Sequence, residues 1–254
     1  MKNTRIRLLS HYRKLLFFNF NRFKGDNYRL MREYLASILI SEIEKFMPIT
    51  NKKVLDIGGG RGEFCKILYE KRKCDAINLE PHPKENIIGW DIKLKKEKIW
   101  PKTRVGFADK IPFGDNKFDL VICRGVLEHI PTNKQQKSMN EMYRVTKKNG
   151  FCYIMIPPRY NPHAGHLLKP FHIFPFKLAK FLRQLFFRNK IKANSYAEAH
   201  LYPITFKRML KMISLTKFKI VGTKDTHFRL HFLTKIPLVR EIMVPAVAFI
   251  LKKE

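Results

Sequence analysis

The sequence of 254 residues is long enough for one substantial domain, or for one domain that carries a smaller cap. Its 45% of apolar residues exclude a disordered chain. Its 51 Lys and Arg against 21 Asp and Glu give a formal net charge of +30, which favours an anionic partner such as a membrane surface, a nucleic acid or a phosphorylated substrate. The alternative is A/T-rich coding bias, because Lys, Asn, Ile and Phe have A/T-rich codons and the chain contains 21 Phe.

The cysteines and the apolar runs of the sequence indicate in which cellular compartment the protein is expected. Cys65, Cys74, Cys123 and Cys152 lie far apart, which excludes a zinc ribbon and a disulfide scaffold and suits a reducing cytosol. The longest apolar run near the C-terminus, residues 244–251, is far shorter than the ~20 residues that cross a bilayer. Residues 15–18 are too short a run for the core of a signal peptide. We expect a cytoplasmic protein that can also lie peripherally on the inner membrane face.

The first half of the chain predicts a basic N-terminal segment and helix, followed by an α/β core. Residues 1–24 contain seven Lys or Arg and no acid, and residues 28–47 show helical spacing of apolar side chains. Over 48–157 the pattern alternates, which predicts strands at 54–57, 75–79, 118–123 and 151–156 and helices at 63–72 and 132–146. Strands separated by helices indicate a Rossmann-like parallel sheet with helices on both faces.

The second half of the chain changes in character after residue 157. Residues 143–196 contain eleven Lys or Arg and no Asp or Glu. Within residues 158–216 the pattern predicts an acceptor-side loop and an inserted basic helical cap, with an apolar stripe flanked by positive charge at 175–188 and a further helix at 203–213. Residues 217–254 predict late strands at 218–223 and 246–251 that complete the sheet, one of them antiparallel.

The strongest motif follows the first predicted strand. That strand carries Asp56 near its end, and glycines follow at positions 58, 60 and 62. Glycines let the backbone turn sharply and approach a ligand closely at the carboxyl end of a strand. Glu80 ends the next predicted strand, where an acid can accept both hydroxyls of a ribose. The pattern predicts a nucleotide-type cofactor, although the glycines alone do not distinguish a dinucleotide from other cofactors.

Four further stretches, at 106–113, 116–123, 126–130 and 141–151, extend this pattern. In order and spacing, residues 53–156 resemble the class I S-adenosylmethionine-dependent methyltransferases, in particular their type 11 branch. The resemblance implies methyl transfer with S-adenosylmethionine as cofactor. It places the following residues in the cofactor site: Asp56 near the methionine amino group, Gly58, Gly60 and Gly62 in the loop along the cofactor, Glu80 on the ribose hydroxyls, and Arg124 at the end of a neighbouring strand.

One departure from the family pattern concerns the adenine. The family usually has an acid at the position of Phe107, and that acid binds the adenine amino group. Ala108 can still offer its backbone N–H to the ring, and the Phe107 ring can pack on it. We consider Asp109, two residues further on, as a replacement for the lost polar contact.

Three histidines are candidate catalytic residues on the acceptor side. A methyltransferase needs a general base only when the acceptor is a poorly acidic hydroxyl or a protonated amine. His129 follows Glu128 in an element similar to one that holds a metal in the ubiquinone-biosynthesis O-methyltransferase, but Gly125 replaces a further acid of that set. His163 and His166 lie in the loop that leaves the strand at 151–156. We expect no metal here. The alternative to a catalytic role is structural: His129 would belong to a helix start packed below the cofactor, and the other two histidines would be ordinary polar residues of a loop.

The sequence does not identify the methyl acceptor. The basic apolar segments at 1–24 and 175–192 favour a small-molecule, lipid-linked or glycan acceptor that is methylated at an anionic membrane surface. RNA is a less favoured partner, because no recognised RNA-binding module and no Asn/Asp-Pro-Pro-Tyr/Phe element is present. A non-catalytic relative that binds the cofactor is the third possibility. If the Phe and Leu of both segments pack onto the sheet instead, only a solvated positive face remains.

Overall fold

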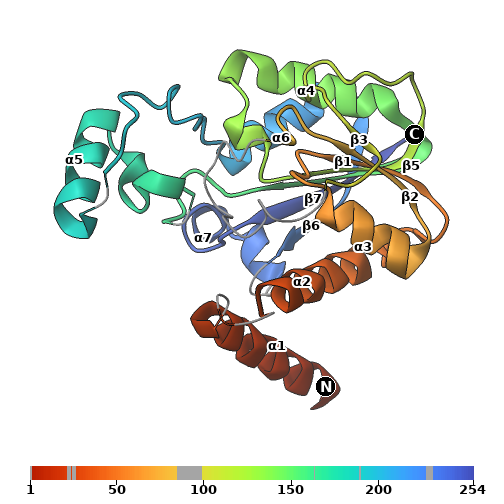
Figure 1. Cartoon of the computed structure of the whole chain (residues 1–254), viewed down its shortest axis with the longest axis horizontal. Coiled ribbons are helices and arrows are strands. Elements are labelled where there is room, and N and C mark those ends of the chain that lie inside the picture. The colour runs from red at the N-terminus through yellow and green to blue at the C-terminus, as the bar shows by residue number, and fades with distance from the viewer. Residues whose placement is uncertain are drawn as a thin grey trace.

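A computed structural model describes residues 2–21, 24, 27–84, 99–162, 164–188, 190–226 and 231–254 (Figure 1). Its strands are β1 Lys53–Ile57, β2 Asp75–Leu79, β3 Thr103–Arg104, β4 Phe118–Arg124, β5 Thr146–Ile156, β6 Phe218–Asp225 and β7 Val247–Lys253. Its α-helices are α1 Lys2–Asn21, α2 Asn27–Ile43, α3 Glu63–Arg72, α4 Thr132–Val145, α5 Phe176–Phe187, α6 Phe206–Ser214 and α7 Pro237–Ile242.

The strands form one sheet in the order β3-β2-β1-β4-β5-β7-β6. β1 pairs in parallel with β2 and β4, and the parallel pairing continues to β3 on one side and β5 on the other. β7 runs antiparallel between β5 and β6. The predicted Rossmann-like sheet with a late antiparallel strand is therefore confirmed. The strand order reverses between β1 and β4, which is where open α/β sheets bind ligands at their carboxyl edge.

Helices cover both faces of the sheet (Figure 1). On one face α4 and α6 bury Met139, Met142 and Phe206 against strand residues such as Phe249. On the other face α2 and α3 bury Ile40 and Leu68, among others. Because both faces are covered, the central strands are apolar almost throughout, and β1 and β4 bury nearly every side chain.

The cap is a separate layer beyond the end of the sheet (Figure 1). It consists of α5 and two short 3-10 turns, His166–Leu168 and Phe171–Ile173. Its small core contains Leu168, Phe176, Ala179, Ile191 and Leu201. In contrast, α6 buries its apolar side in the main core. The cap thus buries few of its apolar side chains, and several on α5 stay exposed.

The four cysteines are buried free thiols. Burial raises the pKa of each thiol, and raises it furthest at Cys65, Cys123 and Cys152. In the part of the chain that the structure describes, no helix combines the length and the apolar character that a membrane-spanning segment needs.

Candidate active site and cofactor pocket

The loop between β1 and α3 is built around glycines with positive φ. Gly58, Gly60 and Gly62 have φ of 67°, 58° and 78°, in the left-handed region that favours glycine. A Cβ on Gly58 would lie 2.4 Å from a methyl carbon of Val126, and one on Gly62 would lie 2.4 Å from Cβ of Trp100. A Cβ on Gly60 would meet nothing within 4 Å. Two of the glycines are therefore required for packing, whereas Gly60 faces open space that a cofactor can fill.

Glu80 and Asn78 hold this loop from β2. The Glu80 carboxylate accepts a hydrogen bond from the backbone N–H of Gly60 at 3.0 Å, and the Asn78 amide donates to the carbonyl of Gly60 at 2.8 Å. A Cβ on Gly59 would lie 2.5 Å from carboxylate and amide oxygens of Asp56 and Asn78. Gly59 and Asn78 were not predicted as site residues from the sequence. A polar residue in the otherwise apolar β2 is the signal that could have found Asn78.

Asp56 is a buried carboxylate beside the loop. Its Oδ2 has no hydrogen-bond partner among the described residues, and Arg124 lies 3.8 Å away. Burial raises the pKa of Asp56, and the Arg124 charge opposes that rise. A buried carboxylate oxygen without a partner is costly, and the ammonium of a bound cofactor would satisfy it. The residues present thus fit the methionine end of S-adenosylmethionine.

The segment expected at the adenine lies between β3 and β4. Phe107 is 54% exposed, and its ring packs edge-on to His82 with centroids 6.2 Å apart. Ala108 is buried. The carboxylate of Asp109 pairs with Lys134 of α4 at 3.4 Å. This segment therefore offers an exposed aromatic ring to the adenine of the cofactor. Asp109 already forms an ion pair with Lys134 of α4.

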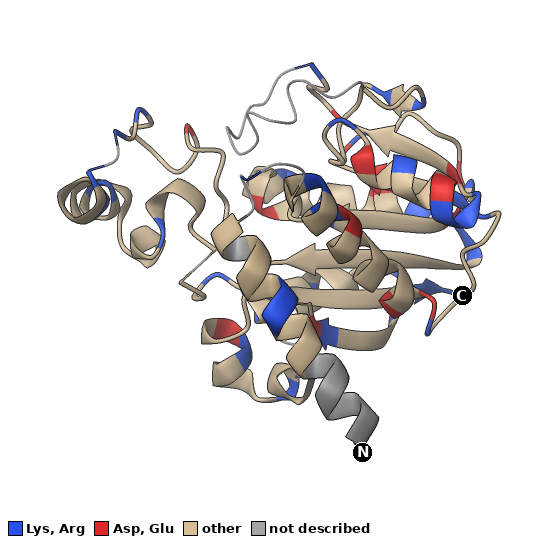
Figure 2. Cartoon of the chain, turned by 60° about the horizontal axis from the view of Figure 1, so that its bottom comes forward, with Lys and Arg blue, Asp and Glu red and all other residues tan. Residues whose placement is uncertain are grey.

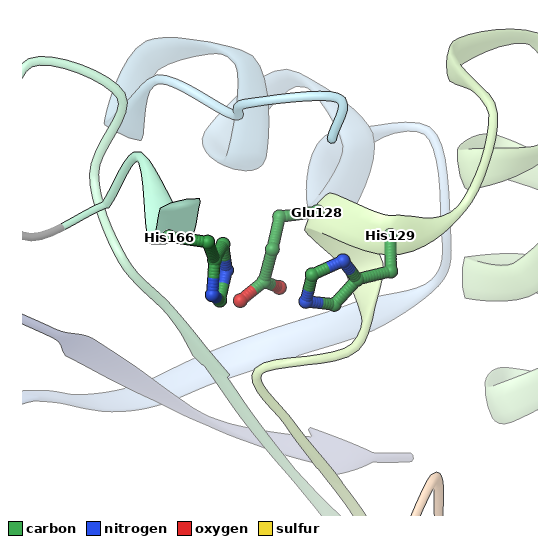
Figure 3. Close-up of side chains that lie close together, drawn as sticks. All are labelled: Glu128, His129 and His166. Carbon is green, nitrogen blue, oxygen red and sulfur yellow. The ribbon is translucent and has the colours of Figure 1, made fainter. Parts of the chain in front are cut away.

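Glu128, His129 and His166 form a cluster on the acceptor side. Glu128 and His129 lie in the 3-10 turn Leu127–His129 after β4, and His166 opens the turn His166–Leu168 of the cap. Figure 3 shows the carboxylate between the two imidazole rings, whose centroids are 4.6 Å apart. One side-chain N or O atom from each residue lies within 4.8 Å of the others. Residues 37 positions apart in sequence thus meet at one point.

Burial sets the protonation of this cluster. It raises the pKa of Glu128 to about 8, lowers the pKa of His166 to about 4 and lowers the pKa of His129. At neutral pH the carboxyl is mostly protonated and both imidazoles are neutral. Nδ1 of His129 lies 2.7 Å from the carbonyl oxygen of His200, so that nitrogen carries the proton and Nε2 keeps its lone pair. This is the state that a general base requires.

The same three atoms could also hold a divalent cation, for which imidazole nitrogens and a carboxylate are suitable ligands. Glu128 would then be ionised, because metal binding displaces the proton. The other predicted loop histidine, His163, lies outside the described residues. His172 has a structural role, since it is buried and its Nε2 lies 2.7 Å from the carbonyl oxygen of Arg159.

The fold and the loop together define a class of enzyme. A glycine loop after β1, an acid after β2 and a reversed strand between β5 and β6 describe a class I S-adenosylmethionine-dependent methyltransferase. Residues 55–154 match the family model described as a methyltransferase domain. S-adenosylmethionine is its cofactor.

Relatives and solved structures agree with this assignment. The chain is 26% identical to an uncharacterised methyltransferase of Mycobacterium leprae over 208 residues, which cover 81% of this chain and 74% of the relative. It is 25% identical to an uncharacterised methyltransferase of Mycobacterium tuberculosis, with coverage of 80% and 78%. Among solved structures, a S-adenosylmethionine-dependent methyltransferase from Archaeoglobus fulgidus shares the fold with a TM-score of 0.52 at 18% identity, covering 89% of this chain and 99% of that chain.

Proposed function

We propose that the enzyme works at an anionic membrane surface and methylates a small-molecule, lipid-linked or glycan acceptor there. The observation that carries this proposal is the outer side of α5. Within α5, Leu178, Phe181 and Leu185 follow one another at spacings of three and four residues, which puts them on one side of the helix. Their exposures of 44%, 58% and 60% show that they do not pack onto the sheet. An apolar row of this kind on a surface indicates a binding face.

The charges around this row suit anionic lipid. Lys177, Arg188, Lys190 and Lys192 are exposed, and Figure 2 shows Lys and Arg at several turns of the cap with little acid between them. Apolar rings enter the headgroup region while basic side chains meet lipid phosphates. Each Lys or Arg near such a surface contributes about 1 kcal/mol, within a Debye length.

The N-terminal helix supplies a second apolar and basic face. In α1, Leu16, Phe17 and Phe20 are exposed, and so are Arg13 and Lys14. Figure 1 shows α5 at the left of the molecule and α1 along its lower edge. Both helices present exposed apolar side chains next to basic ones.

The chemistry assigned to the site follows from its residues. Bound S-adenosylmethionine supplies a sulfonium methyl group that is already strongly electrophilic. Asp56 would hold the ammonium and Glu80 the ribose hydroxyls of the bound cofactor, and the glycine loop would let the backbone approach it. Positioning of the acceptor in line with the methyl group then provides much of the rate. His129 accepts the acceptor proton at Nε2, which suits an acceptor with an ionisable O–H or N–H group.

Vesicle sedimentation tests the membrane part of the proposal. At low salt the protein should sediment with vesicles containing phosphatidylglycerol and not with phosphatidylcholine vesicles. The double substitution Phe181→Ser and Leu185→Ser should reduce this binding about tenfold or more, and removal of residues 1–24 should also weaken it. A matched control, Val105→Ser with Leu215→Ser, removes equally exposed apolar side chains elsewhere and should bind as the unmodified protein does.

Two outcomes would contradict the proposal. One is equal binding by the α5 variant and its control. The other is a protein that ignores anionic vesicles but shifts RNA in a gel at physiological salt, in which case the RNA methyltransferase alternative takes its place.

A further inference from the structure

A cavity of about 230 Å³ lies between α1, α2 and the carboxyl-edge side of the sheet. The apolar part of its wall, which is the larger part, is formed by Leu15 of α1, Leu35, Ile38 and Leu39 of α2, and Tyr153 and Met155 of β5. Polar and charged residues, the acid Asp225 of β6 among them, line the rest. The Glu42–Lys224 ion pair, at 2.5 Å, lines part of the wall as well. Although burial alone would raise the pKa of Glu42, hydrogen bonds from Lys224 and Lys45 lower it to about 2, so the pair is ionised and internally neutralised.

Arg124 joins this cavity to the cofactor side. The residue ends β4, lines the cavity and lies 3.8 Å from the carboxylate of Asp56. Its guanidinium also stacks on the ring of Phe64 at the start of α3, 4.2 Å from the centroid. Only the side chain of Arg124 therefore separates a group held in the cavity from Asp56, the residue expected at the methionine end of the cofactor.

The outer wall is a helix with apolar residues on two sides. Leu15 faces the cavity, and Phe18 is buried on the same helix. Leu16 and Phe17 are exposed on the outside, next to the basic residues Arg13 and Lys14. A helix that rests on a membrane with one side and covers an apolar cavity with the other is suited to pass an alkyl chain from lipid to protein.

We propose that this cavity receives the alkyl or isoprenoid chain of a lipid-type methyl acceptor. The inference rests on the proposed membrane function and specifies its substrate class. The apolar wall accounts for the chain, and Arg124 at the cofactor end suits an anionic group such as the phosphate or carboxylate that such a lipid carries. A freely soluble acceptor without an apolar tail would not cover the apolar side chains that line the cavity.

The test uses the full chain without vesicles and the fluorescent probe 11-(dansylamino)undecanoic acid, which combines an eleven-carbon chain with a carboxylate. The unmodified protein should bind it saturably, with a blue shift of the dansyl emission. Leu15→Trp fills the cavity from α1 and should weaken binding at least tenfold. The matched control Leu16→Trp places the same side chain on the outside of the same helix and should leave probe affinity unchanged. Melting temperature and S-adenosylmethionine affinity report whether each variant is folded.

The outcomes separate this inference from the membrane proposal. Probe affinity that is the same in Leu15→Trp and Leu16→Trp, or no saturable binding by the unmodified protein, overturns the cavity assignment. The same variants are measured with phosphatidylglycerol vesicles, where Leu15→Trp should still sediment. Loss of vesicle binding in the α5 variant, with intact probe binding, supports two distinct sites. Absent vesicle binding with intact, Leu15-dependent probe binding rejects membrane docking and leaves the cavity assignment in place.

Discussion

The cofactor side and the acceptor side of this enzyme differ in how their residues are held. On the cofactor side, the loop after β1 is fixed by its own backbone, by Asn78 and Glu80, and by the space that Gly58 and Gly62 leave for neighbours. On the acceptor side, His129 and His166 come from two separate turns, and the cap leaves most of the apolar side of α5 exposed. A rigid local loop suits a cofactor of constant shape, whereas the acceptor side depends on contacts between distant segments and on an external surface.

The largest expected effect lies on the acceptor side. His129→Gln should lower the rate of methyl transfer by about 10²–10⁴-fold, the usual contribution of a general base, without changing S-adenosylmethionine affinity. The measurement is incorporation of radiolabelled methyl groups into a total lipid extract of the source organism. In the unmodified enzyme the rate should hold at pH 6.5 and fall only at lower pH, because burial lowers the pKa of His129 from 6.5 and protonation removes its lone pair.

His200→Gln is the matched control, because the hydrogen bond of His129 goes to the backbone carbonyl of residue 200, which this substitution keeps. It should transfer methyl groups at nearly the unmodified rate. If His129→Gln retains full activity across this pH range, the histidine only packs at the start of its turn and the enzyme needs no base there.

On the cofactor side, Gly60→Val should weaken S-adenosylmethionine binding by about 5- to 150-fold, the range that corresponds to about 1–3 kcal/mol of overpacking. Gly60 is the sharper probe because its added side chain would enter open space, whereas Gly58→Val would also collide with Val126. Asn116→Val introduces a similar left-handed strain, at φ 52°, away from the loop. Calorimetry that finds the same affinity in both variants would show that the cofactor does not lie over Gly60.

A smaller effect should appear in the pH dependence of stability. The pKa of Glu128 is raised by burial from 4.5 to about 8, so the folded protein keeps a proton that the unfolded chain releases in this window. The free energy of unfolding should therefore fall as pH rises from 4.5 to 8, by up to about 1.4 kcal/mol per pH unit. Glu128→Gln does not titrate at this position. Its free energy of unfolding should therefore lack this part of the fall between pH 4.5 and 8.

Urea unfolding of both proteins at several pH values, in the presence of a chelator, measures the difference. His166, whose pKa is lowered, acts in the opposite sense below pH 6.5 and is the same in both proteins. Parallel stability curves for the two proteins would mean that Glu128 is ionised in the folded state.

Local patterns of apolar residues in the sequence predicted the strands and helices of the parallel core closely. They did not predict which distant segments pair. The boundaries predicted for β2 and α3 agree with the structure. β5 begins at Thr146, five residues before its predicted start, because Thr146 pairs with Phe118 of β4 across an irregularity in register that precedes the pairing of Phe151. The two-residue β3 has too few residues to show a period, and α7 was not expected at all.

The candidate site divides in the same way. Asp56, the glycines and Glu80 are neighbours in a strand-loop-helix-strand unit, so their spacing in sequence predicts their proximity. The meeting of His129 with His166 depends on how the cap folds back, and no local period records that. The cavity under α1 is lined by residues more than 130 positions apart in the sequence, such as Leu15 and Met155.

The burial of the four cysteines has a practical consequence for spectroscopy. Because their thiols are buried and have raised pKa values, they are poor nucleophiles toward a maleimide at neutral pH. A single cysteine introduced at an exposed position, such as Phe186→Cys on α5, would therefore carry a label alone, in an otherwise native background. A polarity-sensitive dye at that position would report the depth of insertion into a bilayer, and the same dye on α1 would report the movement of that helix.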